Sequence, residues 1–397
     1  MSSLLEPAII EKGLTLRNRV AMASMTRNRC VDSFKPGPAQ VRYYADRARD
    51  GPGIIVSEGI FVDWAGTDWK HAPVMASNEH AQAWRAVVDA VHNEGAYMFF
   101  QAWHAGRCQN DQMPIMKSTG RPVLAPSSVP AEDGKYHDLP GIPGHTKNAK
   151  AIENPRDVIE TYRRSILLAK MAGFDGVELL CQGGYLPHQF MNSRANKRTD
   201  AYGGSVENRC RFTLELVDAI SKEFGGPEFI CVKISPTDVL NDSVVTFDEM
   251  QETYTYLIKE LVGRKVGIIN ICRRGANIGA ESANPEGYLS YFPRPEGYPL
   301  PSNYDPVLDF GGLVKCPGSA STLMANQDYD VEEANRLVKE GKIDLVMIGR
   351  PFIYNPDVVN RINKGVSFAK NDRGHSVYYG PYLEPDENYN DWPVAAA

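Results

Sequence analysis

Short apolar runs rich in β-forming residues recur along the chain, and a polar amphipathic stretch follows most of them. The apolar runs are continuous rather than alternating, which is typical of strands buried on both faces of a sheet. The runs predicted to be strands are Arg19–Met25, Gly53–Ser57, Tyr97–Trp103, Gly176–Leu180, Phe229–Ile234, Val266–Ile271, Ser321–Met324 and Asp344–Ile348. The predicted helices are Pro38–Ala48, His80–Asn93, Arg156–Met171, Val206–Phe224, Asp248–Val262, Asp330–Lys339 and Pro356–Asn363.

Eight strands that alternate with helices predict a parallel sheet, and a count of eight favours closure into a (β/α)8 barrel. A doubly wound open sheet is the alternative, but no GxGxxG motif follows a strand and opens a helix. We therefore expect residues 1–397 to form a single (β/α)8-barrel domain. The Asn-Pro pair before Arg156 supports the start of its helix, because Asn caps helices and Pro is favoured at the first helical position.

Two connections are too long for simple turns, Ala105–Ala149 and Cys272–Ala320, and both are rich in Pro and Gly. Both follow strands, so they are expected on the C-terminal face, where barrels carry their chemistry. The first could hold a small hairpin over the barrel mouth. A disordered insert is the alternative for either connection.

Composition and charge indicate which classes of binding partner are unsuitable for this chain. Hydrophobic residues make up 43% and charged residues 23% of the chain, an ordinary globular composition. A net charge of -6 argues against nucleic acid or an anionic membrane as a partner, because both surfaces are negative. The chain opens without a basic segment followed by a long apolar one, and no run approaches the roughly 18 apolar residues of a membrane span. We expect a soluble, cytoplasmic protein, as a monomer or homodimer, that acts on a small molecule.

The seven cysteines are scattered and odd in number. They form no CxxC pair and no Cys/His cluster with zinc spacing, so no metal site is predicted. Cys231 and Cys272 lie inside apolar runs and are interpreted as small core residues.

Four motifs follow one another along the chain, three of them at ends of predicted strands. They are SMTRNR (24–29), QAWHAGR (101–107), RTDAYGGSVENR (198–209) and IGRPFI (348–353). Together and in this order they resemble the old yellow enzyme family of flavin ene-reductases, and the similarity extends from about Glu6 to Pro393. The resemblance implies FMN as cofactor and NADH or NADPH as reductant.

The resemblance also implies which residues contact the flavin ring, whose polar edge must be satisfied when buried. Thr26, with Ser24 and Met25 before it, matches the threonine that tunes the flavin O4/N5 region. Gln101 matches the glutamine at the pyrimidine edge, and Gly59 matches a small residue after the second strand. Lys233 stands where the family has an arginine near N1/O2, so it keeps the positive charge but loses the bidentate fork.

The flavin phosphate is expected at the ends of the last two strands. Gly349 and Arg350 suit backbone-amide and guanidinium contacts there. Many relatives have two small residues after the seventh strand, where this chain has Asn326-Gln327-Asp328. Asp328 would weaken binding of a dianion unless it points away, and we interpret it as the cap of the helix beginning near Asp330.

The substrate site departs from the family. Relatives carry a histidine and, three residues later, an asparagine or histidine that bind the substrate oxygen and make the β-carbon electrophilic. Leu180 and Gly183 occupy these positions, and neither has a side-chain donor. Losing one such donor costs on the order of 10²–10³ in rate. Tyr185 remains at the position of the family's proton donor, and Gln182 is the preferred replacement donor, with Cys181, His104 and the long loops as alternatives.

Trp103 and Tyr378 match aromatic pocket positions, whereas His104 and His188 are interpreted as structural. The favoured function is reduction of an activated alkene such as an enone, maleimide or nitroalkene by NAD(P)H through FMN, with Tyr185 supplying the proton. The alternatives are an FMN-retaining isomerase, desaturase or cyclase of a biosynthetic pathway, and a non-catalytic barrel.

Overall fold

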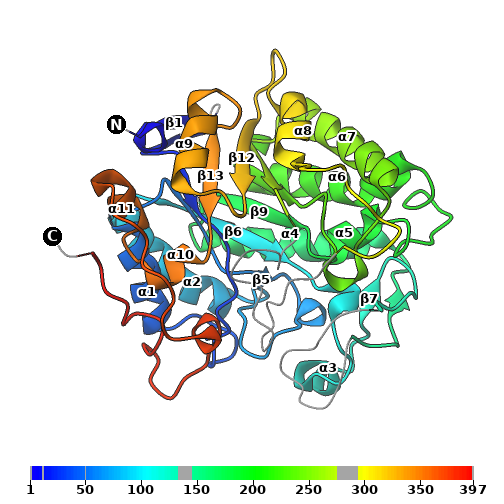
Figure 1. The fold of residues 1–397 in the computed structure, drawn as a ribbon. Helices are drawn as coiled ribbons and strands as arrows, with labels where there is room; N and C mark the ends of the chain where they lie inside the picture. The colour runs from blue at the N-terminus through cyan, green and yellow to red at the C-terminus, as the bar shows by residue number, and fades with distance from the viewer. Residues whose placement is uncertain (1, 11–12, 50, 133–144, 275–293, 396–397) are drawn as a thin grey trace.

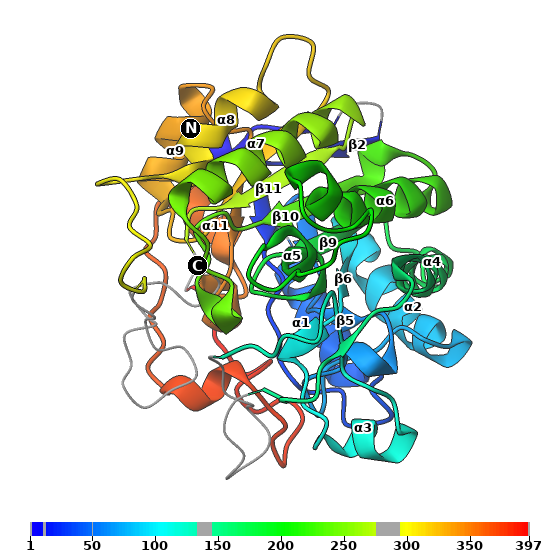
Figure 2. The same ribbon diagram turned by 90° about the vertical axis from the view of Figure 1, so that its right-hand side faces the viewer.

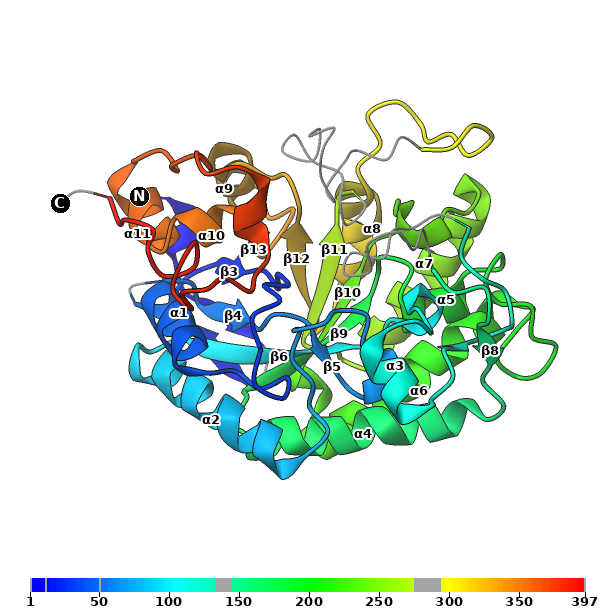
Figure 3. The same ribbon diagram turned by 90° about the horizontal axis from the view of Figure 1, so that it is seen from below.

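A ring of parallel strands forms the centre of the computed structural model, which describes residues 2–10, 13–49, 51–132, 145–274 and 294–395 (Figures 1 and 3). Each strand pairs in parallel with the next, and pairing of Ile54 with Tyr97 closes the ring. The predicted (β/α)8 barrel is confirmed. Its strands are β3 (Val20–Met22), β4 (Ile54–Val56), β6 (Tyr97–Trp103), β9 (Gly176–Cys181), β10 (Ile230–Ile234), β11 (Ile268–Cys272), β12 (Thr322–Asn326) and β13 (Leu345–Ile348).

Helices cover the outside of the barrel (Figure 2). They are α1 (Pro38–Ala48), α2 (Asn78–Asn93), α4 (Pro155–Met171), α6 (Val206–Phe224), α7 (Phe247–Gly263), α8 (Pro306–Val314), α9 (Val331–Lys339) and α11 (Val358–Lys364). The predicted cap of α4 is confirmed, because Asn154 Oδ1 accepts a hydrogen bond of 3.2 Å from Arg156 N and Pro155 is the first helical residue. Helix α8 was missed, although its Asp305-Pro306 start repeats the same signal.

The N-terminal end of the barrel is plugged by an antiparallel pair that the hydrophobic pattern did not predict. Strands β1 (Ala8–Ile10) and β2 (Leu14–Leu16) carry Ile10, Leu14 and Leu16 into one cluster with inward-facing strand residues. Those residues are Ala21, Ala23, Ile54, Val56, Phe99, Cys231, Ile268, Met324, Leu345 and Met347. Among the described residues, this end of the barrel interior is therefore filled by apolar side chains, which directs polar chemistry toward the opposite end.

The C-terminal end carries short elements and the long connections. These elements are β5 (Ile60–Phe61), α3 (Pro114–Thr119), β7 (Leu124–Ala125), β8 (Lys150–Ala151), α5 (Leu186–Met191) and α10 (Pro351–Tyr354). In Figures 1 and 2, α3 and the C-terminal segment lie at the same end of the barrel, away from β1 and β2. β7 pairs with β8 in parallel. The small hairpin that Ala105–Ala149 could hold stays a prediction, because residues 133–144 lie outside the described residues. Part of each long connection lies outside the described residues.

The plug gives a matched test within one strand. Ile10 is fully buried, whereas neighbouring Ile9 is 75% exposed. We expect Ile10→Ala to lower the free energy of unfolding by about 2–5 kcal/mol, because it removes buried methyl groups and leaves a cavity. Ile9→Ala should change it by less than about 0.5 kcal/mol. Chemical denaturation measures both, and equal effects would show that the plug does not close the core.

Candidate active site

The segment after β3 supplies the first predicted cofactor residues. Ser24, Met25 and Thr26 are half-buried and follow the strand directly. Ser24 Oγ donates a hydrogen bond of 2.6 Å to Gln101 Oε1, so the ends of β3 and β6 are joined at this point. Gly349 follows β13, the strand that pairs with β3. A Cβ at Gly349 would be 3.6 Å from Ala23 Cβ and 3.9 Å from Met25 Sδ. The predicted ring and phosphate residues are therefore neighbours.

Gly59 allows a close approach at the end of the second barrel strand. A Cβ at this position would clash with the Trp103 indole and lie 3.1 Å from Gln101 Oε1. Any larger residue would displace Trp103 or Gln101. The small residue expected here is thus required by the packing of the two side chains predicted to contact cofactor and substrate.

A polar layer lies inside the barrel, between the apolar plug and the C-terminal mouth. Gln101 Nε2 donates to Glu178 Oε1 at 2.7 Å, and Asn270 Nδ2 donates to Glu178 Oε2 at 2.9 Å. Lys233 Nζ lies 4.0 Å from Glu178 Oε1. All four side chains are buried. The layer contains two of the predicted cofactor residues, Gln101 and Lys233, together with Glu178 and Asn270, which the sequence analysis did not select.

Arg350 begins α10 and lies beside the C-terminal segment. Its guanidinium carbon is 5.6 Å from the centre of the Tyr378 ring. Tyr378 packs in a cluster with Ile353, Tyr354 and Met25. Arg350, Gly349 and Met25 therefore meet at one corner of the mouth, beside the ends of β12 and β13.

The interpretation of Asp328 as a helix cap is wrong. Asp330 caps α9, with its Oδ1 accepting a hydrogen bond of 2.7 Å from Glu333 N. Asp328 instead lies 3.5 Å from Arg274 as an ion pair. Gln327 and Asp328 have φ values of 74° and 57°, the left-handed region in which glycine is favoured. This conformation suits small residues at positions 327 and 328.

Aromatic side chains form the wall above the polar layer. Leu180 packs in a buried cluster with Phe61, Trp69 and Trp103, against which Tyr185 and Tyr379 also pack. The Phe61 and Trp103 rings stack with centroids 4.3 Å apart, and the Tyr185 ring meets Trp103 edge-on at 4.9 Å. We refer to these six residues as the aromatic cluster. The position that carries histidine in relatives is thus filled by an apolar contact.

Gly183 and Gly184 form a turn that only glycine adopts easily. Their φ values are +66° and +70°. Gly183 N donates to Asp238 Oδ2 at 2.8 Å, and Gly183 O accepts from Asn241 Nδ2 at 2.6 Å. The Gly183 amide is therefore engaged and does not replace the missing side-chain donor.

Tyr185 is held with its proton. Burial raises the pKa of its phenol well above the usual value, and the nearby carboxyl group of Asp68 raises it further. The neutral phenol therefore persists at physiological pH. Gln189 fixes the loop that carries Tyr185, because its Nε2 donates to Gly184 O at 2.6 Å.

Two buried histidines stabilise the same region. His188 Nδ1 accepts a hydrogen bond of 3.1 Å from Gly184 N, and His104 Nδ1 accepts one of 3.1 Å from Gly106 N. Burial lowers the pKa of each imidazole to about 4, so both are neutral at pH 7. Their backbone contacts agree with the structural interpretation.

Gln182 lies on the opposite side of the mouth, toward β11 and β12. Its Oε1 accepts a hydrogen bond of 2.8 Å from Cys272 Sγ, and Asn326 Nδ2 donates to the same sulfur at 3.4 Å. Cys272 is thus more than a small core residue, because it orients the glutamine amide. Among the described residues, none accepts a hydrogen bond from Gln182 Nε2 in this arrangement.

The C-terminal segment is tied to the cofactor loop by Arg27, the residue after Thr26. Arg27 Nε donates to Tyr378 O at 3.0 Å and its Nη2 donates to Val377 O at 2.9 Å. The same segment brings Tyr379 against Trp69, with ring centroids 4.7 Å apart. Tyr379 rather than Tyr378 therefore joins the aromatic cluster, a distinction that two adjacent tyrosines could not reveal in the sequence.

These residues fit an FMN site. Asn270 Oδ1 is buried without a hydrogen-bond partner in the described residues, which leaves an acceptor in the polar layer for a ligand. Gly59 lets Trp103 and Gln101 pack closely against the end of the second barrel strand, and Arg350 supplies a cation beside Gly349. Bound FMN would supply hydride-transfer chemistry, while the protein supplies orientation and charge.

The family comparison decides the assignment. Residues 3–368 match the NADH:flavin oxidoreductase / NADH oxidase family. The chain belongs to this family. It is 32% identical over 386 residues to 12-oxophytodienoate reductase 7 of Oryza sativa subsp. japonica, covering 95% of this chain and 91% of the relative.

Solved structures agree. Morphinone reductase in complex with tetrahydroNAD matches with a TM-score of 0.81 and 30% identity, covering 100% of this chain and 98% of that one. The old yellow enzyme homologue from Zymomonas mobilis matches with a TM-score of 0.83 and 27% identity, covering 99% and 100%. The expected old yellow enzyme resemblance is confirmed, and the chain is an NAD(P)H-dependent FMN oxidoreductase.

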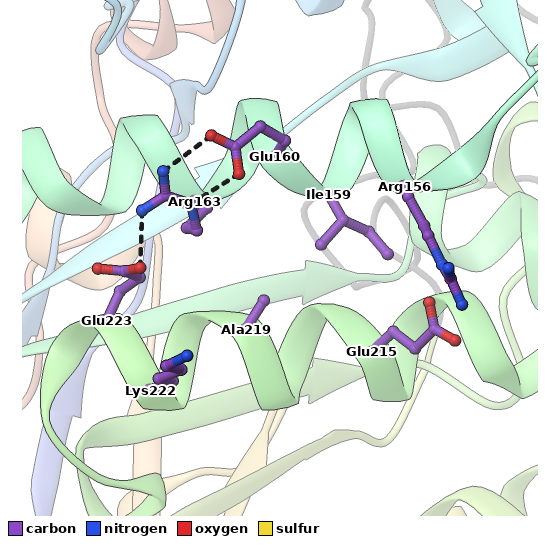
Figure 4. A pocket seen from close by; sticks show the side chains of 8 residues that line it. All are labelled: Arg156, Ile159, Glu160, Arg163, Glu215, Ala219, Lys222 and Glu223. Carbon is purple, nitrogen blue, oxygen red and sulfur yellow. Dashed lines mark hydrogen bonds and ion pairs between the residues drawn. The ribbon is translucent and has the colours of Figure 1, made fainter.

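A surface groove of this flavin oxidoreductase lies away from the barrel mouth and is not part of the candidate active site. A groove between α4 and α6 is lined by Arg156, Ile159, Glu160, Arg163, Glu215, Ala219, Lys222 and Glu223 (Figure 4). Arg163 pairs there with Glu160 and Glu223, each at 2.7 Å, so its charges are largely compensated on the outer surface. Among the described residues, no His/Cys/Asp/Glu group could hold a metal ion, and no helix is long and apolar enough to cross a membrane.

The position of Asp328 after β12 predicts that its negative charge weakens the affinity of this flavin oxidoreductase for FMN. Asp328→Asn keeps a residue that tolerates the left-handed conformation but removes the negative charge. We expect it to lower the Kd for FMN about tenfold, since a carboxylate near a phosphate is unfavourable. Gln327→Gly relieves the backbone without changing charge and is the matched control. Flavin-fluorescence titration of the apoprotein measures both, and equal Kd values for Asp328→Asn and the native protein would place Asp328 away from the phosphate.

Proposed function

We propose that this FMN oxidoreductase reduces the C=C bond of an activated alkene and that Tyr185 donates the proton. The observation that carries the proposal is the placement of Tyr185 against Trp103 in the aromatic cluster, next to a polar layer whose side chains suit a flavin edge. Burial raises the pKa of the Tyr185 phenol, which agrees with a proton-donor role. Alkene reduction needs hydride at one carbon and a proton at the other. Tyr185 is the neutral donor that this pocket holds in place.

The polar layer binds the cofactor, and the aromatic cluster contacts the substrate. Gln101, Lys233 and Thr26 hold and orient the cofactor, and Gly349 and Arg350 hold its phosphate. Trp103, Leu180 and Gly183 line the substrate side without donating a side-chain hydrogen bond. The pocket therefore favours a substrate with a broad apolar face, which stacks on Trp103 and excludes water.

Gln182 takes over polarisation of the substrate oxygen. Its Oε1 is engaged by Cys272, so its Nε2 is the end available to donate. One amide in place of two donors should still leave a weaker oxyanion site than relatives have. We therefore expect substrates whose alkene is already strongly activated, such as maleimides and nitroalkenes, to react faster than simple enones.

The reductant is NADH or NADPH. The morphinone reductase complex contains tetrahydroNAD, which supports a nicotinamide nucleotide as the reductant here. An isomerase, desaturase or cyclase is not favoured by the comparisons. A cytoplasmic location, a monomeric or homodimeric state, the lack of a nucleic-acid partner and the single-domain organisation stay predictions from the sequence.

Separate half-reactions test the function. NADPH-reduced protein, mixed anaerobically with maleimides, nitroalkenes and enones, should be reoxidised with one alkene reduced per flavin. Tyr185→Phe should slow this reoxidation by about 10²–10⁴ and leave flavin reduction by NADPH unchanged, because only the proton donor is lost. Stopped-flow absorbance of the flavin follows both steps. Failure of every alkene to reoxidise the flavin, or turnover that consumes no nicotinamide, would reject alkene reduction.

Phenol binding tests the missing donor pair. A phenolate stacked on the flavin gives a long-wavelength absorption band in the family, and we expect a weak band here because Leu180 and Gly183 cannot hold the phenolate oxygen. Leu180→His should strengthen phenol binding about 10- to 100-fold, the effect of one hydrogen bond to a charged group. Leu180→Met changes the side chain without adding a donor and should leave the titration unchanged. A strong band in the native protein would mean that other residues hold the oxygen.

A further inference from the structure

Glu178 is a carboxylate inside the barrel that neither the fold nor the proposed reaction explains. It lies on β9 in an otherwise apolar run, and its exposed fraction is 0%. Burying a carboxylate is unfavourable unless hydrogen bonds and a counter-charge compensate it. An apolar residue would fill the same interior position without this penalty. Stability alone therefore does not account for a glutamate at this position.

We infer that Glu178 is a positioning residue for the cofactor: it fixes the orientation of the Gln101 amide and offsets the charge of Lys233 beneath the flavin edge. The inference rests on FMN binding, which family membership supports, and not on alkene reduction. Its observations are the 2.7 Å hydrogen bond from Gln101 Nε2, the 2.9 Å hydrogen bond from Asn270 Nδ2 and the 4.0 Å approach of Lys233 Nζ.

The orientation of Gln101 follows from what each partner can do. An ionised carboxylate only accepts hydrogen bonds, so the amide must turn its Nε2 toward Glu178. Its Oε1 then faces Ser24, which donates to it at 2.6 Å. The amide is therefore held at both ends and keeps its acceptor oxygen on the side of the cofactor loop. This acceptor suits the N3–H donor of a flavin pyrimidine edge.

The charge balance follows from the same layer. Strand register pairs Lys233 with two neutral residues, Leu180 on β9 and Asn270 on β11, and Glu178 Oε1 is the carboxylate oxygen that pairs with its ammonium, at 4.0 Å. Burial keeps the pKa of the Cys231 thiol well above its usual value, so Cys231 adds no charge although its Sγ lies 3.5 Å from Glu178 Oε2. Glu178 and Lys233 thus form a nearly neutral pair.

This pairing sets how strongly the site favours reduced flavin. A cation at the N1/O2 edge stabilises the anionic reduced form, and a carboxylate 4.0 Å from the cation weakens that preference. Without the carboxylate, the lysine charge would act on the flavin uncompensated. Glu178 therefore lowers the reduction potential that Lys233 alone would give.

The test is the midpoint potential of the holoprotein, measured by equilibration with redox dyes under anaerobic conditions and without any alkene. Glu178→Gln keeps the size and one acceptor but removes the charge. We expect reduced FMN to gain about tenfold in affinity relative to oxidised FMN, which is an increase of about 30 mV for this two-electron couple. Cys231→Ala is the matched control: it removes another contact of Glu178 without changing charge, and its potential should equal that of the native protein.

A second pair of variants tests the same inference if the Glu178→Gln protein does not fold. Lys233→Met alone should lower the potential, and Glu178→Gln combined with Lys233→Met should bring it back toward the native value, because both charges of the pair are gone. Equal potentials for Glu178→Gln, Cys231→Ala and the native protein would overturn the inference. So would equal potentials for Lys233→Met and the double variant. Because no alkene is present, these outcomes are independent of whether the protein reduces one.

Discussion

Closure of the strand ring at β4 and β6 is the constraint on which the site depends. Most residues predicted to contact the cofactor come from the ends of β3, β6, β10 and β13, which surround one mouth only because the sheet closes on itself. Alternation along each strand then determines the interior. On β6 and β9 it carries Gln101 and Glu178 inward at paired positions, directly above the apolar plug formed by β1 and β2. The plug keeps water out from below, so hydrogen bonds in the polar layer are made in a low-dielectric interior.

The cofactor side and the substrate side of the mouth have different characters. On the predicted cofactor side, Ser24, Gln101, Glu178 and Lys233 form a connected polar set. On the substrate side, Leu180 joins aromatic rings and the Gly183 amide is bound to Asp238. The polar layer and the aromatic cluster therefore differ in what they offer a bound molecule: the first offers hydrogen bonds and charge, the second apolar contact.

Much of this arrangement was predictable from local rules. The boundaries of the eight barrel strands and the predicted helices lie within three residues of the expected ones, because apolar runs and capping residues act locally. Helix α8 escaped because its Asp-Pro start lies in a connection dominated by Gly and Pro. Asp328 was misread because Asp330, two residues later, is an equally good cap and only backbone geometry separates them. Glu178 had a visible signal, a charge within a buried strand, but its partners come from three other strands. Asn270 had a similar signal, an amide within the apolar strand Ile268–Cys272, whereas nothing in the sequence separates Tyr379 from the adjacent Tyr378.

The hold of Arg27 on the C-terminal segment links the two ends of the chain across 351 positions. Its guanidinium also lies 4.9 Å from the ring of Tyr389, which stacks on Tyr43 of α1. A growing polypeptide emerges N-terminus first, so the barrel strands and the Thr26 loop are made long before Val377 and Tyr378. The wall that carries Tyr379 can be added only after the last residues have been synthesised. Completion of the pocket is therefore a late event in the maturation of this enzyme.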